Sequence, residues 1–205
     1  MSTIKTFSTD ELVAAKPTLE KFKSMPRVPI SILLDNVRSL QNVGLFFRLC
    51  DGFRVNRLYL TGITGYPPLL PKQETRRPGV VEHAEREIQK TAIQTVPFVT
   101  WEYHEDPMAV VRKEKEEGAS VGAVELTDKS IPSSEASWSF PLLLIFGHER
   151  EGVQQTLLSA ADSITHISMF GMGNSHNVAV SGGIILSAAF ASLPTPPAPT
   201  DPLGK

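Results

Sequence analysis

Apolar stretches of strand length alternate with amphipathic stretches of helix length along most of this 205-residue chain. Some strand candidates, such as "PLLLIF" at 141–146, are almost continuously apolar, which is typical of strands buried on both faces. We therefore expect an α/β fold with a mostly parallel sheet and helices on both of its faces. The expected strands span residues 28–37, 57–65, 95–103, 119–126, 140–147 and 163–169, and the expected helices span 40–53, 81–92, 106–118, 151–161 and 177–192.

The two ends of the chain lack this alternation. Residues 1–27 are expected to be an N-terminal extension of short helical pieces interrupted by Pro17, and residues 28–192 the domain itself. Residues 193–205 contain "PTPPAPTDPLGK", a composition typical of disordered tails. The N-terminus has no apolar signal core, and no apolar run reaches about 18 residues, so we expect neither secretion nor a membrane partner.

The chain has one cysteine, Cys50, and five histidines. A single cysteine excludes an internal disulfide and fits a reducing compartment, so we expect a cytoplasmic protein. The histidines show neither an HExxH-type motif nor paired spacing, so we expect no metal site.

The net charge of −2 argues weakly against a nucleic-acid partner, but the charge is unevenly distributed. Residues 1–90 hold 14 Lys and Arg against 9 Asp and Glu (+5), and residues 91–205 hold 6 against 13 (−7), which together give −2. This asymmetry fits either a polyanion-binding face or ordinary surface variation.

Ligands of parallel sheets bind at the carboxyl ends of the strands. Three polar or glycine-rich turns follow expected strands there: "ELTDKS" (125–130), "GHEREG" (147–152) and "MFGMGNSHN" (169–177). Gly171 and Gly173 mark a turn in the last of these, and glycine lets a backbone pass close to a ligand. We expect the ligand site at these turns.

Several common catalytic motifs are absent from the sequence. No GxGxxG follows the first strand, and neither GxxxxGK[ST] nor GxSxG occurs, which argues against a dinucleotide site, a P-loop and a serine hydrolase. Cys50 falls on the apolar face of a helix, where cysteine acts as a small hydrophobe, whereas His148 and His176 could serve as general bases. Arg48 stands out in the apolar "FFRLC", either as a snorkelling surface residue or as a functional group.

Three separated segments together resemble the sequence motifs of the SpoU (TrmH-like) RNA 2′-O-ribose methyltransferases of the SPOUT superfamily. They are "NVGLFFR", "GHEREG" and "ISMFGMGNSHNVAV", and "QKTAIQTVPF" also resembles the Lys-Thr-Ala segment of that family. The resemblance covers about residues 29–192. The matching positions are Asn42, Gly44 and Arg48, then Gly147, Glu149 and Gly152, then Ile167, Met169, Ser175, Asn177, Val178 and Val180.

This resemblance implies a C-terminal trefoil knot that holds S-adenosylmethionine, and a homodimer in which Arg48 lies close to the partner's cofactor. The implied cofactor-binding residues are Glu125, Leu126, Gly147, Glu149, Gly152, Ile167, Met169, Ser175, Asn177 and Val178. The implied catalytic residues are Arg48, Asn42, Ser175 and Asn177. Glu149 is expected to brace its motif rather than bind substrate, and His176 replaces an apolar residue more usual between Ser and Asn.

The implied reaction is methylation of a ribose 2′-hydroxyl in tRNA or rRNA. From the basic half of the chain we expect the RNA to contact Arg38, Arg54, Arg57, Lys72, Arg76 and Arg77. Two other functions stay open: a relative that binds RNA or cofactor but has lost catalysis, and an unrelated α/β enzyme that acts on a small molecule.

Overall fold

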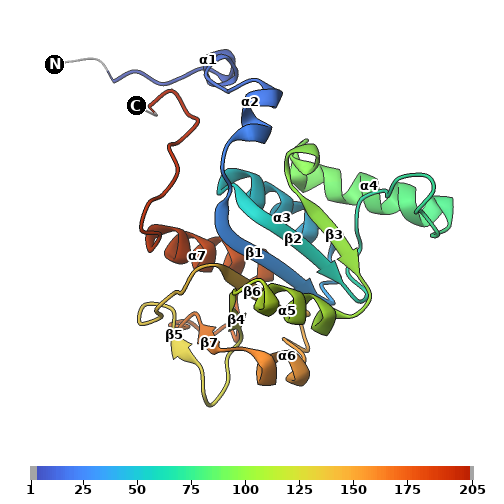
Figure 1. Cartoon of the computed structure of the whole chain (residues 1–205), viewed down its shortest axis with the longest axis vertical. Helices are drawn as coiled ribbons and strands as arrows, with labels where there is room; N and C mark the ends of the chain where they lie inside the picture. The colour runs from blue at the N-terminus through green and yellow to red at the C-terminus, as the bar shows by residue number, and fades with distance from the viewer. Residues whose placement is uncertain (1–3, 204–205) are drawn as a thin grey trace.

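The computed structural model describes residues 4–203, in which seven strands form one sheet in the order β3-β2-β1-β6-β4-β7-β5 (Figure 1). Every strand pair is parallel, as expected from the apolar strands. The strands are β1 (Val28–Asp35), β2 (Val55–Thr61), β3 (Trp101–His104), β4 (Ser120–Val124), β5 (Ile131–Pro132), β6 (Leu142–Phe146) and β7 (Ser163–His166). The helices are α1 (Thr9–Ala14), α2 (Leu19–Ser24), α3 (Leu40–Gly52), α4 (Pro78–Ala92), α5 (Pro107–Glu116), α6 (Gln155–Ala160) and α7 (Val178–Ala191), with a 3₁₀ helix η1 at Val96–Phe98.

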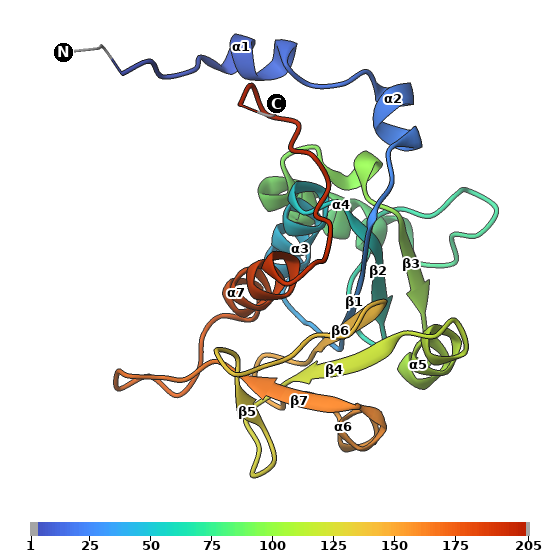
Figure 2. The ribbon, with the colours of Figure 1, turned by 60° about the vertical axis from the view of Figure 1, so that its left-hand side comes forward.

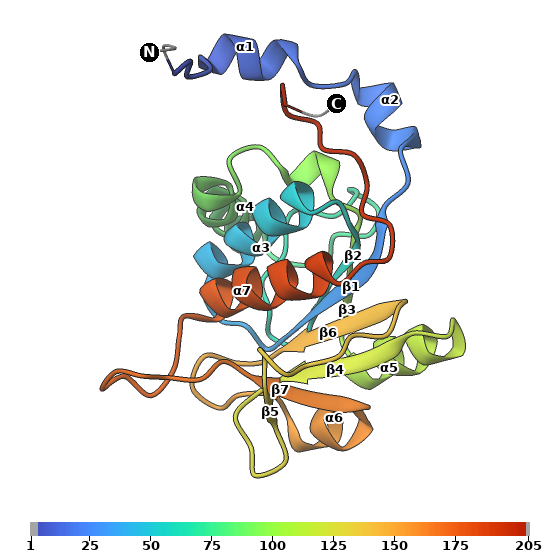
Figure 3. The same ribbon diagram turned by 90° about the vertical axis from the view of Figure 1, so that its left-hand side faces the viewer.

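Helices cover both faces of the sheet, which confirms the predicted α/β architecture. Helices α3, α4 and α7 pack on one face, and α5 and α6 pack on the other (Figure 3). The two central strands β1 and β6 are buried almost throughout. Each face therefore has its own apolar cluster, and strands β1, β2 and β6 contribute buried residues to both clusters.

Helices α3 and α4 pack so closely that Gly44 has no room for a side chain. A Cβ at Gly44 would collide with Thr91 Oγ1 and with the carbonyl oxygen of Ile88. Thr91 Oγ1 also donates a hydrogen bond to the carbonyl of Gln41 at 2.8 Å. Gly44 and the "KTA" segment thus meet at one helix contact, which gives both of them a packing role.

The structure changes some predicted boundaries. The segment 95–103 is only partly a strand, because Pro97 lies in the 3₁₀ helix η1 and β3 begins at Trp101. Strand β7 ends at His166 rather than at residue 169, and α6 begins at Gln155 rather than near residue 151. Strand β5 was not predicted, because two residues carry no periodic pattern.

The described part of the Pro-rich tail runs back past the N-terminal extension (Figure 1), where Lys16 Nζ lies 3.4 Å from Thr200 Oγ1. Disorder of residues 193–205 and the trefoil knot both stay predictions, and residues 1–3 and 204–205 lie outside the described part of the chain. Within that part, no helix is both long enough and apolar enough to span a bilayer.

Candidate active site

A cavity of about 710 Å³ lies at the carboxyl edge of the sheet, beside the ends of β4, β6 and β7. Three turns that are far apart in the sequence meet at this cavity, as the parallel topology predicted. Its wall includes every residue expected to bind cofactor: Glu125, Leu126, Gly147, Glu149, Gly152, Ile167, Met169, Ser175, Asn177 and Val178.

The turn after β6 closes on itself through a tight backbone contact. His148 and Gly152 exchange two backbone hydrogen bonds of 3.1 and 2.9 Å. A Cβ on Gly147 would collide with the backbone of Gly152, so only glycine fits at residue 147. Gly152 has φ +71°, a left-handed conformation that favours glycine.

The carboxylate of Glu125 connects the turn after β4 to the turn after β6 through hydrogen bonds. Its Oε2 accepts a hydrogen bond from Val153 N at 2.9 Å, and its Oε1 accepts one from Leu126 N at 3.0 Å. A side chain on Gly152 would collide with this carboxylate. Glu125 therefore shapes the cavity wall through its side chain.

A chain of hydrogen bonds joins the three motifs through Glu149, Asn42 and Asn177. Glu149 accepts hydrogen bonds from Arg38 N and Ser39 N, both at 3.0 Å, and from Asn42 Nδ2 at 2.9 Å. Asn177 Nδ2 then donates to Asn42 Oδ1 at 3.0 Å. We call Glu149, Asn42 and Asn177 the motif bridge.

The motif bridge also fixes the starts of two helices. Ser39, whose N–H bonds to Glu149, is the N-cap of α3, and Asn177 is the N-cap of α7, accepting from Ala179 N and Val180 N. Burial by itself would raise the pKa of Glu149, but the hydrogen bonds that the carboxylate accepts, those from the backbone of Arg38 and Ser39 first among them, together outweigh burial and hold the pKa below its usual range. Glu149 is therefore ionised at neutral pH and connects the second motif to the first.

The four expected catalytic residues occupy different places. Ser175 and Asn177 line the cavity, whereas Asn42 is 6% exposed and lies behind it in the motif bridge. Arg48 is exposed on α3 and lies outside the cavity wall. Within residues 4–203, Arg48 forms no ion pair with a carboxylate. One chain thus assembles the cavity without bringing Arg48 to it.

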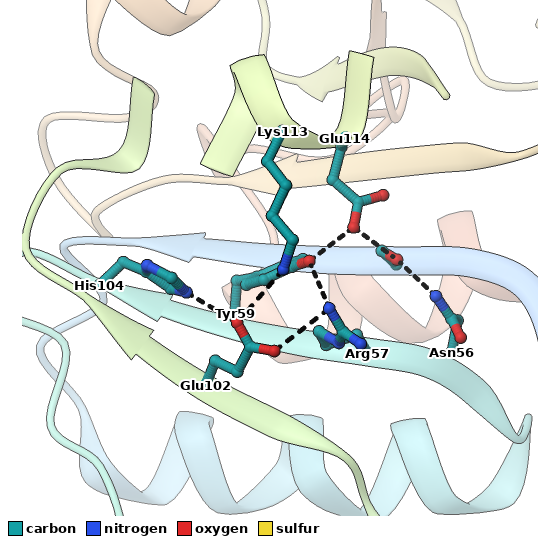
Figure 4. Close-up of polar contacts among 8 residues, drawn as sticks. Asn56, Arg57, Tyr59, Glu102, His104, Lys113 and Glu114 are labelled. Carbon is teal, nitrogen blue, oxygen red and sulfur yellow. Dashed lines mark hydrogen bonds and ion pairs between the residues drawn. The ribbon is translucent and has the colours of Figure 1, made fainter. Parts of the chain in front are cut away.

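Two of the arginines expected at an RNA surface are engaged inside the fold instead. Arg54 is 7% exposed and donates to the carbonyl of Pro26. Arg57 pairs with Glu102 at 3.1 Å and donates to Tyr59 Oη at 3.2 Å, in a polar cluster between β2, β3 and α5 (Figure 4). These guanidiniums have protein partners that sequence spacing does not reveal, and their contact with RNA stays a prediction.

Arg76 also forms hydrogen bonds within the fold, and its contact with RNA stays a prediction. Its guanidinium bonds to both carboxylate oxygens of Glu74, at 2.8 and 2.7 Å, and to the carbonyls of Tyr66 and Pro67. Arg38, Lys72 and Arg77 are exposed.

Several residues of the cavity wall were not expected to bind cofactor. They are Val124, Phe146, His148, Arg150, His166, Ser168, Asn174, His176 and Ser181. Most of them fall within or beside the three turns, so their place in the sequence was the available signal. His148 Nδ1 accepts hydrogen bonds from Arg150 N and Glu151 N at 3.1 Å, which gives it a structural role in the turn.

The cavity fits a ligand of the size and polarity of a nucleoside derivative. Its volume lies within the range of about 300–1,000 Å³ that is usual for small-ligand sites. Among residues 4–203, the backbone groups of Ile167, Ser168 and Met169 bond to no other backbone group, so they are free to bind a ligand. Within residues 4–203, no three or more His, Cys, Asp or Glu side chains are grouped so that they could bind a metal.

The parallel α/β fold and the cavity at the carboxyl edge of its sheet together define this protein as an α/β domain that binds a small ligand. The model of the SpoU rRNA Methylase family matches residues 29–187, so the chain belongs to that family. It is 26% identical over 176 residues to a tRNA (guanosine(18)-2′-O)-methyltransferase of Thermus thermophilus, in a match that covers 86% of this chain and 81% of the relative.

Solved structures share the fold. The Aquifex aeolicus TrmH/SpoU tRNA modifying enzyme matches with a TM-score of 0.63 and 24% identity, over 84% of this chain and 82% of that one. The AdoMet-bound rRNA methyltransferase of Sinorhizobium meliloti matches with a TM-score of 0.64 and 21% identity, over 85% of this chain and 61% of that one.

Proposed function

We propose that this protein transfers a methyl group from S-adenosylmethionine to the ribose 2′-hydroxyl of a tRNA or rRNA nucleotide, in the cytoplasm. The observation that carries the proposal is the single cavity in which the three motif turns meet and the motif bridge connects them. The names of the relatives support an RNA substrate, and the T. thermophilus relative favours tRNA.

The cofactor would be held by the backbone of Gly147, Ile167 and Met169, with Ser175 and Asn177 at the same wall. When bound, S-adenosylmethionine supplies a methyl group on a positively charged sulfur. The chain's own task is to align the 2′-hydroxyl with that methyl group, and alignment can supply much of a rate enhancement.

Arg48 would bind the target phosphate or ribose and stabilise negative charge there. A guanidinium stays protonated at any ordinary pH, so Arg48 cannot itself accept the proton of the 2′-hydroxyl. The proton would leave through the neighbouring phosphate or a water molecule.

The position of Arg48 favours a homodimer, in which this side chain serves the partner's cavity. Large apolar side chains are exposed at the rim of the cavity and on α7: Leu126 (66%), Phe170 (98%), Met172 (102%), Val180 (50%) and Ile184 (40%). Exposed apolar side chains near the cavity support a protein contact at this surface. Arg48 lies on α3, which packs directly against α7.

The reaction is tested by incubating the protein with tritiated S-adenosylmethionine and total tRNA or rRNA, then digesting the RNA to nucleosides. We expect label in a 2′-O-methyl nucleoside, none with Arg48→Ala, and undiminished binding of S-adenosylhomocysteine to that variant. Full activity of Arg48→Ala removes the catalytic assignment. Cofactor binding without label in any RNA favours a non-catalytic relative.

A mixing experiment tests the shared site. A chain with Arg48→Ala keeps its cavity, and a chain with Gly147→Ala keeps its arginine, so each homodimer should be inactive. Mixed dimers recover one complete site only if Arg48 acts on the partner. No recovery in mixed dimers that have been isolated as such contradicts the shared site.

A further inference from the structure

The loop that joins β2 to α4, residues 62–77, projects from the rest of the domain (Figure 2). Loops of this length without regular structure are uncommon in compact domains, and most are functional or disordered. This loop has extensive internal bonding, so disorder does not describe it. Its construction and its charge point to a role outside the cavity.

Glu74 and Arg76 close the loop on itself, and we call this pair the buckle. Arg76 pairs with both oxygens of Glu74, and the side chains of both residues are 15% exposed. Arg76 also donates to the carbonyls of Tyr66 at 2.8 Å and Pro67 at 3.1 Å, while Glu74 accepts from Leu69 N at 3.1 Å. A bidentate arginine–carboxylate pair of this kind holds one geometry.

Aromatic stacking fixes the neck of the loop to the edge of the sheet. The Arg76 guanidinium lies 3.6 Å from the centre of the Tyr66 ring, and Tyr66 stacks on Tyr103 of β3 with ring centres 4.1 Å apart. Tyr103 Oη donates to the carbonyl of Gly62 at 2.9 Å. The first and the last residues of the loop are therefore both held against β3.

The buckle also sets the charge of the loop. Glu74 is the only carboxylate between residues 62 and 81, and its hydrogen bonds from Arg76 lower its pKa to about 2. Its charge is thus neutralised by Arg76 at any ordinary pH. Lys72 and Arg77 remain exposed, and within residues 4–203 neither forms an ion pair with a carboxylate.

Hydrogen bonds link the base of the loop to the cavity. Ile63 N donates to Asn36 Oδ1, and Val37 N donates to Thr64 Oγ1, both at 3.0 Å. The neighbouring residue, Arg38, donates its N–H to Glu149 of the cavity wall. Residues 36–38 therefore connect the base of the loop to the cavity wall, and the exposed Arg38 lies between the two.

We infer that the loop 62–77 is a preformed arm that docks the phosphate backbone of the RNA substrate through Lys72 and Arg77, and that the buckle is what keeps it preformed. This inference rests on the proposed function, because it takes RNA as the partner. Rigid presentation lowers the entropy lost on binding, so the buckle acts on RNA affinity rather than on the methyl transfer itself. Arg76 and Glu74 are positioning residues.

The charge of the arm is tested with the double variant Lys72→Ala/Arg77→Ala, measured by filter binding of radiolabelled total tRNA over a range of salt concentrations. Each phosphate contact contributes about 0.7–0.9 to the slope of log affinity against log salt. The loss of two contacts therefore lowers that slope by about 1.5 and weakens binding about tenfold at moderate salt.

The matched control is Lys21→Ala/Lys23→Ala on α2, which removes two exposed positive charges that, like Lys72 and Arg77, form no ion pair with a carboxylate within residues 4–203. The control keeps the wild-type slope. An unchanged slope in the arm variant, or an equal fall in the control, overturns the docking role.

The buckle is tested separately with the double variant Glu74→Gln/Arg76→Gln, which removes the ion pair without changing the net charge and keeps Lys72 and Arg77. We expect weaker tRNA binding and a raised KM for RNA at an unchanged salt slope, with the same kcat and the same affinity for S-adenosylhomocysteine. A generally disturbed structure would lower kcat or cofactor affinity as well. A wild-type KM for RNA in Glu74→Gln/Arg76→Gln overturns the preformed arm.

Failure of the inference can be told apart from failure of the proposed function. If the wild type labels no RNA, the proposed function fails, while the filter-binding comparison still decides the docking role. If the wild type labels RNA and both loop variants bind and methylate it normally, only the arm is rejected.

Discussion

The motif bridge makes a quantitative prediction for Glu149→Gln. Glutamine keeps one acceptor oxygen, which can serve Ser39 N and Asn42 Nδ2, but it presents an N–H to Arg38 N where the carboxylate had its second oxygen. Hydrogen bonds to a charged acceptor contribute about 1.5–3 kcal/mol each. Since water can replace the exposed Arg38 contact, we expect the free energy of unfolding to fall by about 1–2 kcal/mol.

Urea unfolding at neutral pH measures this change, with Glu151→Gln as the matched control. Glu151 lies in the same turn, is exposed, and its substitution changes the charge equally. With a urea dependence of about 2–3 kcal/mol per molar, the midpoint of Glu149→Gln should fall by about 0.5 M and that of Glu151→Gln should hardly move.

The pH dependence identifies the carboxylate as the cause. The pKa of Glu149 is lowered in the folded protein, so its contribution is complete above its unfolded pKa of about 4.3 and is lost as the pH falls through the folded value. The difference between wild type and Glu149→Gln should therefore be constant near neutral pH and shrink below about pH 4.3. Equal midpoint shifts in both variants, or a difference that persists in acid, would refute the reasoning.

Two further predictions concern α3. Gly44→Ala should destabilise the protein by about 1–3 kcal/mol through overpacking against Thr91 and Ile88, whereas Gly52→Ala, with no atom within 4 Å of the added methyl, should not. Thermal unfolding compares the two variants, and similar melting temperatures would count against the close contact. Burial raises the pKa of the Cys50 thiol, so the folded protein should not react with a thiol reagent at neutral pH, while the urea-unfolded protein should react fully. Rapid reaction of the native protein would mean that Cys50 is accessible.

The sequence predicted the sheet well because its strands carry strong signals. Runs such as residues 142–146 are apolar at every position, and in the fold each of these positions is buried. The two-residue strand β5 and the 3₁₀ turn at Val96–Phe98 have too few residues for any period to appear. Their conformations depend on neighbours that only the folded chain provides.

The sequence predicted which turns form the site, but it did not predict the hydrogen bonds between them. Spacing placed Glu149 in the second motif, but its hydrogen bonds come from Asn42 of the first motif and from Arg38 and Ser39 just before that motif, more than 100 residues away. Contacts that form only in the folded chain also explain why the sequence did not reveal the internal bonds of Arg54, Arg57 and Arg76. An arginine in a sequence looks the same whether it meets solvent or a buried carbonyl, so exposure had to come from the structure.

The central claim is that the three turns form one cofactor cavity that depends on close backbone contact at Gly147. Calorimetric titration with S-adenosylhomocysteine tests it most directly, using the wild type, Gly147→Ala and the control Gly171→Ala, where an added methyl meets no atom within 4 Å. We predict that the wild type and Gly171→Ala bind one ligand per chain and that folded Gly147→Ala binds none. Wild-type affinity in Gly147→Ala, or no binding to the wild type, would contradict the account.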